Sequence, residues 1–203
     1  MIQVAIVDDI FHAGAELVFG GSPQLPNNMD FAWPLCASCD GPMQYLGRVP
    51  HPIEAEECVL VFQCGNEPGL CDEWDPTAGG NAAIVVNAMQ AEHTVVPPEE
   101  GVTTLAGQWS GHVVALDIES YEAARAGFDG PKRQILGHLG GEAEWLQADE
   151  TPSCKSCGQR MIFAAQLEEG PDYRTAMNFG GGGCGYLFVC PTSDKQAAFL
   201  WQS

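Results

Sequence analysis

The sequence predicts a β-rich α+β fold made of two pseudo-symmetric repeats, each with a zinc-ribbon-like Cys-x-x-Cys knuckle. Three observations support this prediction. Two Cys-x-x-Cys pairs stand in matching stretches, PLCASCDGPMQYLGRV at 34–49 and PSCKSCGQRMIFAAQL at 152–167. The segments after each pair alternate between apolar and polar residues, or are rich in β-branched and aromatic side chains, which is typical of strands. Only residues 120–127 have a convincing helix pattern.

The match between the two stretches indicates an internal duplication. Identical residues stand at equal places: Pro34/Pro152, Cys36/Cys154, Ser38/Ser156, Cys39/Cys157 and Met43/Met161. We therefore expect three regions. Residues 1–87 would form an N-terminal element and repeat one with a four-cysteine site. Residues 88–134 would be a linker with a strand and a short helix, and residues 135–203 would be repeat two with a partial cysteine site.

The expected elements follow one another in the same order in both halves. Strands are predicted at 3–7, 43–49, 59–63 and 82–86 in the first half, and at 161–167, 185–189 and 197–201 in the second. Between the halves, residues 112–120 alternate like a strand. Ser120 and Gly127 are residue types that often begin and end a helix. The glycine run at 179–186 leads into a strand and lacks the Lys-Ser/Thr of a phosphate loop, so it predicts a tight turn.

Acidic residues dominate the charge of the chain, which has 203 residues and a net charge of −19. Residues 1–101 contain 15 Asp and Glu and one basic residue, Arg48, which gives −14; residues 102–203 contain 12 acidic and 7 basic residues, which gives −5. This field repels phosphate and argues against nucleic-acid binding, whereas it attracts basic proteins or peptides. The sequence has no apolar run of about 18 residues and no recognisable export signal. We therefore expect a cytoplasmic protein without membrane association.

The nine cysteines point to metal binding. Their number is odd and no export signal is seen, so disulfides are the weaker interpretation. A redox role is also less favoured, because strands rather than a helix follow the Cys-x-x-Cys pairs. The first-half ligands, in the spacing C-x2-C-x24-C-x6-C, are Cys36, Cys39, Cys64 and Cys71. Four thiolates fill the tetrahedral coordination of Zn²⁺, so this set predicts a structural zinc site.

The second half offers an incomplete set. The matching ligands are Cys154, Cys157 and Cys190. A fourth ligand could come from Asp194, His138 or Cys184; otherwise the site would stay open or bind no metal.

Two cysteines are expected in the hydrophobic core instead. Six residues of extended strand separate Cys184 from Cys190, and they span about 20 Å. Two sulfurs on one zinc ion lie only about 4 Å apart. The same argument separates Cys58 from Cys64. Only a bend at the glycine run would bring Cys184 to the metal.

A duplicated pattern of glycine, proline and aromatic residues resembles the YwqG-like family of bacterial proteins of unknown function. The opening of that pattern is carried by Gly20, Gly21, Pro23, Trp33 and Pro34. A Phe-x-x-Gln strand motif is carried by Phe163 and Gln166, and Tyr45 and Arg48 replace these residues in the first copy. The cysteines depart from the simplest members. They are similar, more distantly, to the programmed-cell-death-two proteins, and that resemblance implies a scaffold able to hold a basic client. The family supplies no catalytic residues to transfer.

These observations leave three functions open. The leading hypothesis is a zinc-stabilised, non-catalytic interaction module for a basic protein partner. The first alternative is a hydrolase-type enzyme with a cleft between the repeats, although no histidine stands in an HExxH or triad-like context. The second alternative is metal sensing or storage through the incomplete second site.

Overall fold

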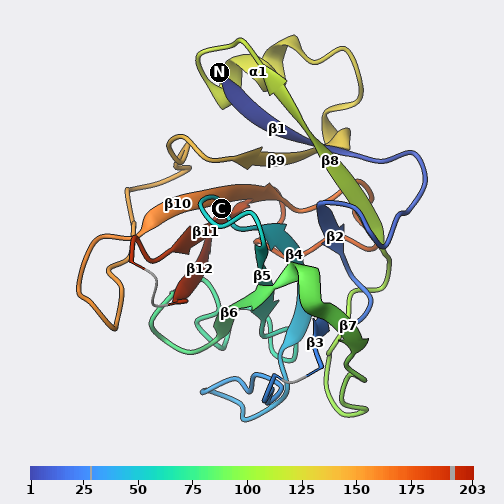
Figure 1. Cartoon of the computed structure of the whole chain (residues 1–203), viewed down its shortest axis with the longest axis vertical. Coiled ribbons are helices and arrows are strands. Elements are labelled where there is room, and N and C mark those ends of the chain that lie inside the picture. Colours follow the sequence, from blue (N-terminus) through green and yellow to red (C-terminus); the bar gives the residue numbers. More distant parts are fainter. Residues whose placement is uncertain (28, 193–194) are drawn as a thin grey trace.

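The computed structural model describes residues 1–27, 29–192 and 195–203, and this part of the chain is built mainly from strands (Figure 1). The strands of the first half are β1 (Ile2–Val7), β2 (Leu17–Phe19), β3 (Gln24–Pro26), β4 (Gln44–Pro50), β5 (Glu57–Gln63), β6 (Asn81–Asn87) and β7 (Ala91–Thr94). The later strands are β8 (Trp109–Leu116), β9 (Ile135–Leu139), β10 (Ile162–Glu168), β11 (Cys184–Val189) and β12 (Ala197–Gln202). The helical elements are α1 (Tyr121–Gly127) and the 3-10 turns η1 (Ala88–Gln90) and η2 (Lys132–Gln134). None of them is long and apolar enough to cross a membrane.

Ten strands form one antiparallel sheet in the order β12-β11-β10-β9-β1-β8-β2-β4-β5-β6, while β3 and β7 pair separately. The sheet curls until its two edge strands meet. An isolated bridge joins Ile84 of β6 to Gln196 beside β12, and the rings of Trp74 and Trp201 pack edge to face at 6.0 Å across the same seam.

The two halves of the sheet have the same internal order. Strands β2-β4-β5-β6 correspond to β9-β10-β11-β12, and β1 and β8 lie between the two sets. Each half has a register shift at the same place, between Tyr45 and Gly47 in β4 and between Phe163 and Ala165 in β10. The segment 88–134 thus contributes β8 to the middle of the sheet; the domain boundaries at 87 and 134 stay a prediction.

The central strand of each half is buried on both faces. In β5, Val59 and Val61 lie in the core enclosed by the curled sheet, while Leu60 and Phe62 lie in a second apolar cluster on the outer face. Because successive side chains of a strand point to opposite faces, a continuous apolar run serves both cores. Strand β11 does the same, with Leu187 on the inner face and Phe188 on the outer face. The cysteine knuckles belong to the two outer clusters.

The predicted strands are present, but the strand expected at 112–120 is β8, which begins at Trp109 and ends at Leu116. The helix begins and ends as expected. Ser120 accepts a hydrogen bond from the N–H of Ala123 and caps α1, which ends at Gly127. The glycine run is a turn, as predicted: the Glu169 carboxylate accepts hydrogen bonds from the N–H groups of Phe179, Gly181 and Gly182.

Four short strands were not predicted, namely β2, β3, β7 and β9. Each has only three to five residues, which is too short for a period of two to be recognised. Their strand form depends on pairing with neighbours far away in sequence, such as β2 with β4 and β8.

Candidate metal centres

A tight turn builds the Cys-x-x-Cys knuckle of each half. In the first, the N–H of Cys36 donates to the carbonyl of Gly41, and the N–H of Asp40 donates back to Cys36. Asp40 has a positive φ of 56°, which a short polar residue tolerates. In the second knuckle, Gly158 takes this place with a φ of 73°, and its N–H donates to the carbonyl of Cys154.

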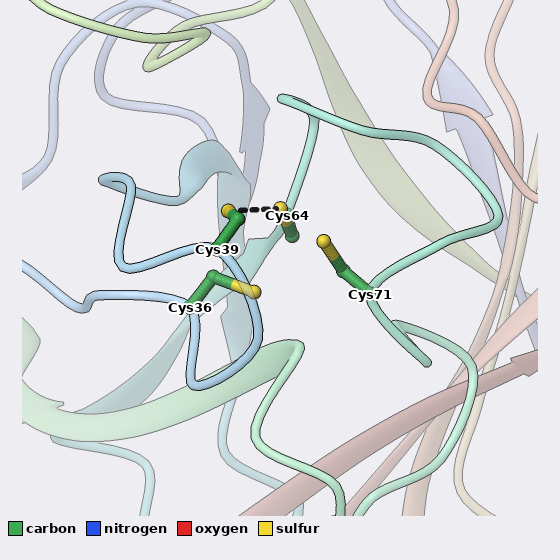
Figure 2. A group of neighbouring side chains, drawn as sticks. All are labelled: Cys36, Cys39, Cys64 and Cys71. Atoms are coloured by element: carbon green, nitrogen blue, oxygen red, sulfur yellow. Dashed lines mark hydrogen bonds between the residues drawn. The ribbon is translucent and has the colours of Figure 1, made fainter.

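The first knuckle meets two further cysteines that follow β5. Figure 2 shows the sulfur atoms of Cys36, Cys39, Cys64 and Cys71 facing a common centre. All four sulfurs lie within 4.8 Å of one another, and those of Cys39 and Cys64 are 3.7 Å apart. Sulfurs at the corners of a tetrahedron around Zn²⁺ would be separated by about 3.8 Å, given Zn–S bonds of about 2.3 Å. The four-cysteine group can therefore hold a metal ion.

The surroundings of the four sulfurs act on thiolates in two opposite ways: backbone N–H groups stabilise the ionised form, and burial destabilises it. The backbone N–H of Gly41 is the main reason why the pKa of Cys39 is lowered. Burial raises the pKa values of Cys64 and Cys71 above that of an ordinary thiol, and Cys71 is 0% exposed. Buried thiols of this kind need a nearby cation to ionise, and a bound divalent ion supplies that charge.

Asn66 supports the first cluster from outside, and the sequence analysis did not identify it. Its side-chain Nδ2 lies 3.8 Å from the sulfurs of both Cys39 and Cys64 and donates to the carbonyl of Pro42 at 3.0 Å. Its Oδ1 accepts the N–H of Val102 at 2.8 Å, which fixes the amide orientation. A Cβ at Gly41 would lie 2.6 Å from this amide. The only available signal was an amide two residues after a ligand cysteine, which is too common to single out.

The second cluster contains three cysteines. The sulfurs of Cys154, Cys157 and Cys190 lie within 4.8 Å of one another, and those of Cys157 and Cys190 are 3.5 Å apart. Thr192 makes a close contact from its Oγ1 to the sulfur of Cys190, at 3.1 Å, and this hydroxyl is the main cause of the lowered pKa of Cys190. This group too can hold a metal ion.

The candidates for a fourth ligand lie elsewhere or outside the described residues. Cys184 is at the opposite end of β11 from Cys190, and its sulfur lies 3.9 Å from a Glu168 carboxylate oxygen. Strand β11 runs without a bend that would bring Cys184 back, so the extended-strand argument decides its position. Burial raises the pKa of this thiol to about 12. Cys58 is likewise buried, as expected, and its pKa is raised to about 11.

His138 does not join the second cluster among the residues that the structure describes. Its Nε2 lies 3.3 Å from the Gln166 side-chain oxygen, and its ring packs between Tyr121 and Phe163. Its side chain points from β9 toward Tyr121 of α1 and not toward the cysteines. Asp194 lies outside the described residues.

A polar group that the sequence analysis missed lies where β1 meets β8. The Asp8 carboxylate accepts a hydrogen bond from the Ser110 hydroxyl at 2.6 Å and pairs with His112 Nδ1 at 2.7 Å. The serine donates to the carboxylate and not to the histidine, so the three residues do not form a serine–histidine pair of the triad type. Asp8 is 102 positions from Ser110 and 104 positions from His112 in the sequence.

An acidic cavity of about 540 Å³ lies between α1 and the double-glycine turn after β9. Three carboxylates line it, from Glu119, Glu142 and Glu144, together with apolar and aromatic side chains such as Leu139 and Tyr121. In the described part of the chain, no Lys or Arg lines this cavity. Glu144 is held in place, since its carboxylate accepts the N–H of Glu122 in the first turn of α1.

Comparison with known proteins shows a similarity over part of the chain. No family model matches the chain, so the YwqG-like resemblance rests on its sequence motifs. A stretch of 72 residues is 32% identical to the Uncharacterized protein YpfL of Salmonella typhimurium, which amounts to 34% of this chain. The chain spans only 15% of the length of that protein. The similarity connects the chain to an uncharacterised protein and assigns no residue a role.

Proposed function

We propose that the protein is a zinc-stabilised, non-catalytic interaction module that binds a basic protein or peptide. The observation that carries the proposal is the convergence of the sulfurs of Cys36, Cys39, Cys64 and Cys71. Four thiolates leave no coordination position for a substrate, which is the arrangement of structural rather than catalytic zinc sites. Zinc is favoured over other ions because an all-cysteine tetrahedral set without oxygen ligands suits it best, with iron as the main competitor. Free thiols as ligands also favour a reducing, cytoplasmic compartment.

The matching halves support a common origin by duplication, as the sequence repeats suggest. The same backbone hydrogen bond occurs after β5 and after β11: the N–H of Cys64 donates to the carbonyl of Gly80, and the N–H of Cys190 donates to the carbonyl of Gln196. The double-glycine turns are also equivalent, since Gly20 donates to Leu46 and Gly140 to Ala164. This architecture agrees with the duplicated pattern of the YwqG-like family, and we propose that the chain is a cysteine-bearing relative of it.

The acidic cavity beside α1 is the best candidate contact for a basic side chain of the partner. Its carboxylates and its apolar wall suit the two parts of a lysine or arginine side chain, the charged end and the aliphatic stem. The overall charge of −19 would bring a basic partner to this surface more often, and the same charge disfavours nucleic acid.

A charge-matched pair of variants tests the cavity. The double substitution Glu119→Gln with Glu142→Gln removes two cavity carboxylates that make no hydrogen bond among those described. The control, Glu99→Gln with Glu100→Gln, removes the same charge from exposed positions outside the cavity. Binding of a short Lys- and Arg-rich peptide is measured by calorimetry at low and at physiological salt. Exposed ion pairs contribute about 0.2–1 kcal/mol each, so removing two of them should weaken binding about twofold to thirtyfold more in the cavity variant than in the control. Equal weakening by both variants would reject the cavity as the contact.

A further inference from the structure

The second cysteine cluster reproduces three of the four ligand positions of the first. The knuckles share their turn hydrogen bonds, and a backbone N–H faces a ligand sulfur at equivalent places: Gly41 at Cys39 and Gln159 at Cys157. After β5 and β11, the backbone N–H groups of Asn66 and Thr192 likewise face the sulfurs of Cys64 and Cys190, respectively. Backbone N–H groups directed at sulfur atoms stabilise thiolates, the form that binds metal ions, so the second cluster has the geometry of a metal site.

The fourth position differs because the chain after β11 is short. In the first half, residues 65–80 lie between Cys64 and the start of β6, and they supply Cys71. In the second half, only residues 191–196 lie between Cys190 and β12. Within the ranges 1–27, 29–192 and 195–203, no fourth Cys, His, Asp or Glu joins the three sulfurs.

The second cluster is also more open to solvent than the first. Cys157 is exposed, whereas each of the four ligands of the first cluster is buried or half-buried. A cavity of about 310 Å³ adjoins Cys190 and extends to His51 and Glu57 of the first half. A molecule from solution can therefore approach this cluster.

We propose that the second site binds a zinc ion through Cys154, Cys157 and Cys190 and keeps its fourth coordination position for an exogenous ligand, a small-molecule thiol. Zinc with three protein ligands and one exchangeable position is the arrangement of reactive rather than closed sites. A zinc ion held by three thiolates leaves one tetrahedral position unfilled, and a further thiolate suits that position because Zn²⁺ binds soft sulfur ligands well. The ion of the first site holds the fold, and the ion of the second site is exchangeable.

This inference does not depend on a basic partner. It shares with the proposed function only the premise that the knuckles bind zinc, and the two sites can be followed separately in one protein.

Cobalt substitution of the full chain tests the proposal, because Co²⁺ bound by thiolates absorbs visible light in a way that reports its ligands. Wild type should bind two Co²⁺ ions, and titration with 2-mercaptoethanol should change the spectrum of one of them. Cys157→Ser should keep one ion and lose the response to the thiol. Cys184→Ser, a buried cysteine of the same half outside the cluster, is the control and should keep both ions and the response. With a competing chelator, one zinc ion of wild type should leave at least about tenfold faster than the other.

Three results would overturn the proposal: a single ion in wild type that Cys157→Ser leaves unchanged, a second ion whose spectrum ignores the thiol, or a change of that spectrum in Asp194→Asn. The last result would mean that the chain itself closes the site. Failure of the first zinc site is distinguishable from these outcomes, because it would remove the ion that persists in Cys157→Ser.

Discussion

Replacing Cys71 by serine probes the closed four-cysteine site most directly. Cys71 is 0% exposed, and its sulfur faces the other three (Figure 2). The substitution removes one ligand and places a hydroxyl among sulfurs. We expect the variant to bind one fewer zinc ion than wild type and to lose much of its stability, because metal binding and folding are coupled.

The size of the effect follows from two contributions. Free zinc at about 1,000 times its dissociation constant stabilises the folded state by about 4 kcal/mol, and the variant loses this contribution if its affinity falls below the zinc concentration. A buried hydroxyl without a partner costs about 1–3 kcal/mol more. The loss of about 5–7 kcal/mol corresponds to a decrease in melting temperature of about 10–28 °C in a chain of this length.

Cys58→Ser is the matched control. Cys58 is 5% exposed and lies in the apolar cluster beside the first site, but it is not among the ligands. It should cost only the hydroxyl contribution of about 1–3 kcal/mol and leave the zinc content unchanged. Zinc is measured by elemental analysis and stability by thermal unfolding at constant free zinc. If Cys71→Ser retains the zinc of wild type and is no less stable than Cys58→Ser, the reasoning about the closed site is wrong.

Two further predictions concern the junctions of the sheet. Burial tends to raise the pKa of Asp8, but hydrogen bonds from Ser110 and His112 outweigh it and the pKa is lowered; the carboxylate therefore contributes stability above its unfolded pKa of about 3.9, and this contribution is lost as the pH falls through the folded pKa. The free energy of unfolding is measured in urea between pH 6 and pH 3, roughly the range over which carboxylates titrate. It should fall less with decreasing pH for Asp8→Asn than for wild type, and identical pH profiles would contradict the assignment. Gly137→Ala should cost at least about 3 kcal/mol, because Gly137 has a φ of 132° and a Cβ there would lie 1.8 Å from the carbonyl oxygen of Gln166. Its control, Gly127→Ala at the end of α1, meets nothing within 4 Å and should change stability by less than about 1 kcal/mol; equal effects in chemical denaturation would show that the β9–β10 contact is not tight.

The spacing of the cysteines predicted which residues would come together, because ligand spacing is a local property of a turn and of a strand end. Cys36 and Cys39 share one knuckle, and Cys64 follows directly after a strand that the apolar run at 59–63 identifies. The same strand geometry placed Cys58 in the core, where the structure has it. Alternation and apolar runs likewise predicted most of the long strands.

Contacts between distant segments were not predictable in this way. Asp8 meets Ser110 and His112 only because β1 pairs with β8, and nothing near Asp8 in the sequence marks that partner. The continuity of the sheet through β1 and β8 was missed for the same reason: the repeats suggested two units and a linker, but pairing between strands depends on the whole chain. Asn66 was missed because its role depends on the position of the cysteine sulfurs and not on its sequence neighbours.

The place of β1 in the sheet has a consequence for how the protein is made. This strand is formed by residues 2–7, whereas its two neighbours in the sheet, β8 and β9, are formed much later in the chain, by residues 109–116 and 135–139. Until residues 109–116 have been synthesised, both edges of β1 lack their partners, and the first half of the sheet cannot join the second half. Residues 2–7 therefore pair with their neighbours only late in synthesis. A nascent chain stalled before residue 109 would expose β1 as an unpaired strand, and such strands are prone to pair with other chains.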